Sequence, residues 1–112
     1  MSVEGVWKVE ILGPYGWEAI GTVFLEKGRY LGASAHHYSF GTYEADDEAF
    51  KAKIRVTQHG ERRAIFGAKK KQFDMKMNCK MKKSGRISGT AQPADGQDFV
   101  MNIRLSPLDK LS

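Results

Sequence analysis

The sequence predicts an all-β protein, and within that class an eight-stranded antiparallel up-and-down β-barrel. Apolar residues recur at every second position along most of the chain, which is the period of a strand, and no stretch has the period of a helix. Turn signals built on glycine and proline separate these stretches at hairpin length. Such links leave little room for crossovers, and closing the meander into a barrel removes its open edges. A two-sheet sandwich has the same alternation and is the alternative architecture.

The first half of the chain is expected to hold four strands, at residues 3–12, 17–26, 29–36 and 38–44. Residues 13–16 form a turn between the first two, and Lys27 with Gly28 makes a tight turn into the third. In the second strand, strict alternation places Ile20, Thr22 and Phe24 on one face and Gly21, Val23 and Leu25 on the other.

The second half is also expected to hold four strands, at residues 50–59, 73–82, 86–92 and from Phe99 until Pro107 ends the regular structure. The alternation is clearest in the second of these, where Phe73, Met75, Met77, Cys79 and Met81 share one face. Phe99, Met101, Ile103 and Leu105 share a face of the last. Residues 61–71 interrupt the pattern and are left unassigned.

Length and composition predict a single cytoplasmic domain over residues 1–112. No apolar run approaches the roughly 20 residues that span a bilayer, and no secretory signal is visible at the start. The lone Cys79 cannot form an internal disulfide, which is typical of a reducing compartment. Residues 1–50 carry three Lys or Arg against eight Asp or Glu, whereas residues 51–112 carry fifteen against five, so an acidic and a basic side are expected.

The residues typical of catalysis or metal binding do not form a recognisable pattern. His36 and His37 are adjacent on an expected strand and should point to opposite faces, so they should not share a metal; one of them could join His59 and an acid. Cys79 lies on an apolar face, where a free cysteine is usually inert. We therefore expect a protein that is not an enzyme and has no metal and no cofactor.

The methionines raise the question of an apolar cavity. The side chains assigned to a candidate cavity are Trp7, Phe24, Ile54, Met75, Met77, Met81 and Met101. Methionine is flexible and suits adaptable apolar pockets, but it also fills cores. A filled barrel and a barrel that holds a small apolar ligand both remain open at this point.

A basic patch is expected on one outer wall. It comprises Lys69, Lys70, Lys71, Lys76, Lys80, Lys82, Lys83 and Arg86. Barrels that bind single-stranded nucleic acids combine such charge with exposed aromatic side chains. Here the aromatic residue next to the patch, Phe73, falls on the apolar face. We therefore do not expect direct nucleic-acid binding, and we interpret the lysines as a solvated face.

An acidic turn follows the fourth strand. Its carboxylates are Glu44, Asp46, Asp47 and Glu48. Aspartate is common in turns, but four carboxylates within five residues repel one another. A basic partner would relieve this repulsion and be steered to the turn.

Short motifs along most of the chain resemble the GrlR-type negative regulators of type III secretion. The similarity starts at Glu4-Gly5-Val6-Trp7 and continues through Gly21, Gly28, Gly32, Tyr38, Gly41, the acidic turn, His59-Gly60 and Phe66-Gly67. The resemblance implies a small lipocalin-like barrel that associates as a homodimer. It also implies an acidic loop of E-D-E-D type, which in the type member binds and blocks a helix-turn-helix transcriptional activator. That loop corresponds to residues 45–48 here.

The chain departs from this family in three places. Ala45 replaces the first acid of the loop, with Glu44 beside it. Gly32-Ala33-Ser34 stands where the family often has Gly-Gly-Asp, and residues 61–71 form a shorter segment. The opening Gly5-x-Trp7 also resembles the G-x-W of lipocalins and fatty-acid-binding barrels. The expected function is therefore a regulatory, protein-binding barrel, and the alternative is a carrier or sensor of a lipid-like ligand.

Overall fold

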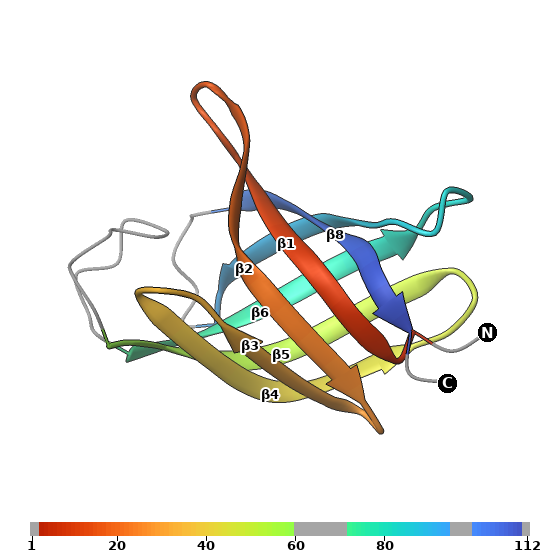
Figure 1. Ribbon diagram of the computed structural model, residues 1–112, viewed down its shortest axis with the longest axis horizontal. Coiled ribbons are helices and arrows are strands. Elements are labelled where there is room, and N and C mark those ends of the chain that lie inside the picture. The colour runs from red at the N-terminus through yellow and green to blue at the C-terminus, as the bar shows by residue number, and fades with distance from the viewer. Residues whose placement is uncertain (1–2, 60–71, 95–99, 111–112) are drawn as a thin grey trace.

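The chain forms a closed barrel of eight antiparallel strands (Figure 1). The structure, a computed structural model, describes residues 3–59, 72–94 and 100–110. Within these residues the strands are β1 (Gly5–Gly13), β2 (Gly16–Glu26), β3 (Arg29–Ala33), β4 (His37–Ala45), β5 (Ala49–Gln58), β6 (Gln72–Met81), β7 (Ile87–Pro93) and β8 (Met101–Lys110). Each strand pairs with the next, and β8 closes the barrel onto β1. The predicted fold class is confirmed, and the sandwich alternative is wrong. No described segment forms a helix long and apolar enough to cross a membrane.

Alternating burial along the strands produces the core. In β5 the side chains of Phe50, Ala52, Ile54 and Val56 are buried while the lysines and arginine between them are exposed. The largest fully buried side chains come from five strands: Phe50, Leu25, Met77, Ile87, Ile103, Leu105 and Val23. Burying each such side chain stabilises the fold by about 1.5–3 kcal/mol. The apolar side chains that fill the interior thus stabilise the barrel.

The turn between β2 and β3 confirms the prediction of a tight turn. Lys27 and Gly28 both have positive φ, 50° and 79°, between the paired residues Glu26 and Arg29. Two positive values in a two-residue loop define a type I′ turn, whose twist matches that of the strands. The Lys27 backbone N–H donates to a carboxylate oxygen of Glu4 at 2.9 Å, which ties this turn to the start of β1.

A β-bulge makes the strict alternation predicted for β2 wrong. Val9 pairs with Gly21 and the next residue, Glu10, pairs with Ala19, so Ile20 is an extra residue in β2. Ile20 packs against the core, yet so do Val23 and Leu25. Ile20 and Val23 are three positions apart, and both can point inward only because the bulge shifts the alternation by one position. Phe24 lies between two buried neighbours and therefore faces outward.

Two predicted strand ends are also wrong. Residue Pro107 does not end the last strand, because β8 continues to Lys110 and Pro107 pairs with Trp7. Strand β7 pairs with β8 only as far as Leu105. Pro107 therefore has a strand partner on one side only, and such an edge position tolerates proline. At the other site, β3 ends at Ala33 instead of residue 36. There the Ser34 hydroxyl accepts the backbone N–H of His37 at 3.1 Å and turns the chain.

Candidate functional site

The acidic turn forms the tip of the β4–β5 hairpin. The backbone N–H of Asp46 donates to the carbonyl of Ala49 at 3.0 Å and closes the turn. The carboxylate oxygen Oδ1 of Asp46 accepts the backbone N–H groups of Glu48 and Ala49, both at 2.8 Å. These two hydrogen bonds lower the pKa of Asp46. The Asp46 carboxylate, which the sequence assigns to partner recognition, therefore orders the turn.

The other carboxylates of the turn lie on the surface. Glu44, Asp47 and Glu48 are exposed, and Glu44 pairs across the ladder with Lys51. The carbonyl of Glu48 accepts the backbone N–H of Met81 at 2.9 Å, which fixes the hairpin to the end of β6. The tip thus presents Asp47 and Glu48 on a backbone held from two sides.

Most of the side chains assigned to the candidate cavity do line the interior. Trp7, Ile54, Met75 and Met77 are buried, and Met81 and Met101 are partly buried against the core. The assignment of Phe24 is wrong for the reason given above: it lies on the outer wall between Val6 and Leu31.

The space left inside the barrel is small. A cavity of about 60 Å³ lies among Tyr30, His37, Ile54, Met75 and Met77. Pockets for drug-sized ligands hold roughly 300–1,000 Å³. Trp7 occupies the interior with its indole N–H donated to the carbonyl of Val3 at 2.8 Å. Within the described residues, then, side chains fill the barrel.

The three histidines lie near one another at one end of the barrel. His59 donates its backbone N–H to the carbonyl of His36 at 2.8 Å, and its ring nitrogen Nε2 lies 3.2 Å from the carbonyl of Ser34. His37 is buried at the start of β4. Within residues 3–59, 72–94 and 100–110, no three His, Cys, Asp or Glu side chains are grouped to hold a metal ion.

Cys79 is not placed as a reactive thiol. Its side chain is buried on the inner face of β6, and burial raises its pKa to about 11. At neutral pH the thiol is therefore protonated.

The described part of the basic patch lies on β6 and in the β6–β7 turn, and sequence reasoning overlooked an aromatic pair on β4, two strands away. Tyr38 and Phe40 project outward from β4, and Phe40 pairs with Arg55 of β5. The signal was present in the sequence, because Ser39 and Gly41 alternate with these two aromatic residues and are the small inward residues of the strand. Lys76, Lys80, Lys82, Lys83 and Arg86 of the predicted patch are exposed. Lys69, Lys70, Lys71, Phe66, Gly67 and Phe99 lie outside the described residues.

Comparison with known proteins gives no family assignment: no protein-family model matches the chain, and no curated protein matches it. What the geometry defines is a closed eight-stranded β-barrel with a filled interior and charged outer surfaces. The resemblance to the GrlR-type regulators stays a prediction.

Proposed function

We propose that this protein is a non-enzymatic binding module that recognises a basic protein partner through the tip of the β4–β5 hairpin. By the resemblance above, the partner would be a helix-turn-helix transcriptional activator, and the protein would act as its negative regulator. The observation that carries the proposal is the ordering of the tip by Asp46, which holds the chain bearing Asp47 and Glu48 in one conformation. A preorganised loop loses less entropy on binding than a flexible one.

The filled interior favours this proposal over the carrier. A lipid-like ligand would have to displace buried side chains, because the open space amounts to about 60 Å³. Displacing the buried Met75 or Met77 means giving up the burial energy that holds the barrel together.

The test is a binding measurement with charge-neutral, isosteric substitutions that leave Asp46 in place. The double variant D47N/E48Q is compared with wild type against purified helix-turn-helix regulators of the same genome by biolayer interferometry. We expect the association rate to fall several-fold and its salt dependence to flatten, because charges at an interface act mainly through steering. The matched control E18Q/D109N also removes two carboxylates, and it should bind as wild type does.

Two outcomes would contradict the proposal. One is equal binding by D47N/E48Q and wild type at low and high salt. The other is a saturable change in tryptophan fluorescence with fatty acids, together with no regulator bound, which would favour the carrier.

A further inference from the structure

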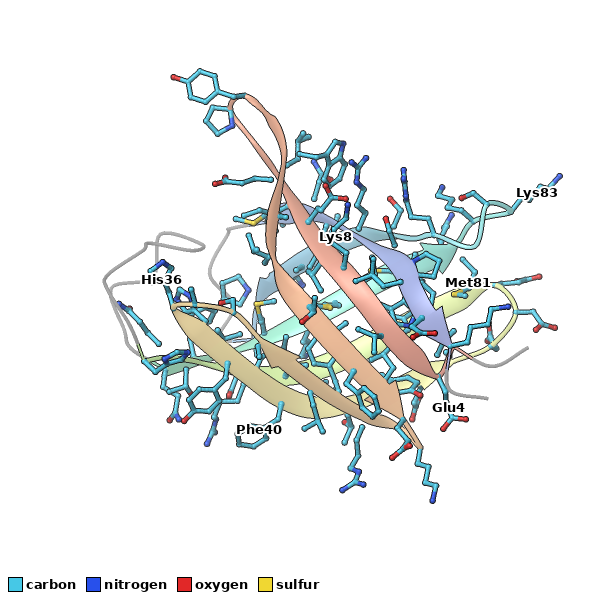
Figure 2. All side chains as sticks on the ribbon, viewed as in Figure 1. Glu4, Lys8, His36, Phe40, Met81 and Lys83 are labelled. Atoms are coloured by element: carbon cyan, nitrogen blue, oxygen red, sulfur yellow. The ribbon has the colours of Figure 1, made fainter. Side chains whose placement is uncertain are left out.

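The outer wall of β3 and β4 exposes large apolar side chains that the hairpin proposal does not use. Leu31, Tyr38 and Phe40 are 48%, 42% and 52% exposed. The rings of Tyr38 and Phe40 are nearly parallel, with an angle of 9° and centroids 6.4 Å apart. The His59 ring lies 5.9 Å from that of Tyr38 and extends the row. Figure 2 shows Phe40 on the outside of the barrel, pointing away from the strands.

The register places positive charges around this aromatic pair. Phe40 pairs directly with Arg55, and the next outward residue of β4, Thr42, lies between Arg29 and Lys53. Direct neighbours across a ladder lie about 5 Å apart and diagonal neighbours about 7–8 Å apart. The side chains of Arg55, Arg29 and Lys53 are therefore direct or diagonal neighbours of Phe40 on the outer wall.

The charges of this wall are only partly balanced: Asp74 pairs with Arg55 and Glu26 lies opposite Arg29, whereas Lys53 and Lys76 have no carboxylate directly across the ladder. Lys53 faces Lys76 directly across the β5–β6 ladder, an arrangement of like charges that is unfavourable. The nearby carboxylate of Asp74 is already held by the Arg55 guanidinium at 2.8 Å, which lowers the pKa of Asp74. A surface groove of about 360 Å³ runs between Phe40, Lys53 and Lys76, and the Arg55–Asp74 ion pair also lines it. An anionic ligand in this groove would relieve the repulsion.

We propose that this surface binds a single-stranded nucleic acid, with bases stacked on Tyr38 and Phe40 and phosphates over Arg29, Lys53 and Lys76. We call it the stacking face. Every unpaired base offers a π-face to an exposed ring, and the flanking cations follow the backbone. A duplex hides these base faces, so it could contact only the charges.

The charges also decide between a nucleic acid and a second copy of the chain as the occupant. In a two-fold dimer the same patch meets itself, so the stacking face would bring its arginines and lysines against those of its partner. Like charges brought together at an interface cost several kcal/mol. A polyanion has the complementary charge.

The experiment is fluorescence anisotropy with labelled oligouridylate and oligodeoxythymidylate of about 12 nucleotides, within the roughly 4–16 nucleotides that one OB-fold barrel covers. Y38A and F40A should each weaken binding on the order of tenfold, as the loss of one stacked base does. K53Q/K76Q should reduce the salt slope of log K by about 1.4, since each phosphate contact on a single strand contributes about 0.7. The two oligomers separate a preference for RNA from one for DNA.

Matched controls separate the stacking face from general charge. Y15A removes a fully exposed aromatic ring from the β1–β2 turn, and K82Q/K83Q removes two charges from the β6–β7 turn, where Figure 2 shows Lys83 far from Phe40. Both controls should bind as wild type does, and every variant should stay folded at the assay temperature, with a melting temperature a few degrees lower in Y38A and F40A because about half of each ring is buried.

Three results would overturn the proposal. The first is no binding to either oligomer at low salt. The second is equal loss in K53Q/K76Q and K82Q/K83Q with no loss in Y38A or F40A, which means unspecific attraction. The third is a wild-type dimer in sedimentation that F40A converts to a monomer, which makes this face an interface between copies. D47N/E48Q should retain its affinity for the oligomers at physiological salt, so failure of the hairpin proposal and failure of this one are distinguishable.

Discussion

Substituting Gly41 with alanine tests how the barrel curves beside the stacking face. Gly41 lies between Phe40 and Thr42 on β4, and its missing side chain would point inward toward β5. A β-carbon there would lie 2.0 Å from the carbonyl oxygen of Lys53 and 2.7 Å from the Cα of Ile54. Ordinary van der Waals contact begins at 3.4 Å, and both obstacles are backbone atoms. The two strands must therefore separate by more than 1 Å.

The cost follows from the packing and the ladder. Overpacking of this kind costs typically 1–3 kcal/mol, and the separation weakens one or two backbone hydrogen bonds worth about 1 kcal/mol each. The unfolded chain of the alanine variant has less conformational entropy, which offsets about 0.4–1 kcal/mol of this destabilisation. We expect a net destabilisation of about 2–4 kcal/mol, which for a domain of 112 residues lowers the melting temperature by roughly 8–17 °C.

The assay is thermal and urea unfolding followed by circular dichroism. Gly13→Ala is the matched control, because its β-carbon would meet nothing closer than 3.6 Å, and it should melt within a few degrees of wild type. Gly89→Ala should resemble Gly41→Ala, since its β-carbon would lie 2.2 Å from the carbonyl oxygen of Asn78. A Gly41→Ala variant that melts as wild type does would refute the argument from close backbone approach.

Two further predictions concern ionisable groups. The Glu10 carboxylate accepts a hydrogen bond from Arg104 at 3.1 Å, which lowers its pKa below the ordinary 4.5. The stabilisation by this interaction is therefore present above pH 4.5 and is lost as the pH falls through the lower pKa of the folded state. In urea unfolding, wild type should be more stable than E10Q, and this difference should shrink with acidification. A difference that does not change with pH would contradict the prediction. Cys79, with a pKa of about 11, should react with a thiol reagent about 100-fold or more slowly in the native protein than in denaturant, and equal rates would mean that β6 is open.

The fold could be predicted from the sequence because burial depends on a two-residue period. In β5 and β6 every inward residue is where alternation places it, including Phe50, Ile54, Met75 and Met77. The prediction failed where the chain departs from that period. The bulge at Ile20 is invisible to a pattern of apolar residues, because the side chains on both sides of β2 are apolar.

The candidate site was harder to predict because hydrogen bonds decide what a carboxylate does. Asp46 and Asp47 are chemically identical and adjacent, so composition assigns them one role. Only the turn geometry reveals that the Asp46 carboxylate accepts two backbone N–H groups. A variant that replaces all the acids of the tip would therefore confuse loss of the turn with loss of recognition.

The stacking face was missed because it depends on register between distant segments. Phe40, Arg55 and Asp74 are neighbours on the wall although 15 and then 19 positions separate them in the chain. Phe73 and the lysines of its own strand alternate between the two faces of β6, so no ring of that strand lies beside its lysines. An exposed ring lies beside outward charges when it comes from an adjacent strand, as Phe40 of β4 does beside Arg55 of β5.

The meander topology explains how one small barrel can carry two surfaces of opposite charge. Consecutive strands are neighbours, so β1–β4 of the acidic first half and β5–β8 of the basic second half each cover a continuous part of the wall, and the two parts meet between β8 and β1 and again between β4 and β5. Both proposed surfaces lie at the latter boundary: the tip at Asp47 and the stacking face around Phe40. Seven residues of strand and turn place them on the order of 20 Å apart at about 3.4 Å per residue. That distance exceeds the Debye length of about 8 Å at physiological salt, so the two surfaces should act independently there, whereas at about 0.01 M salt, where the Debye length is about 30 Å, neutralising the tip should tighten nucleic-acid binding.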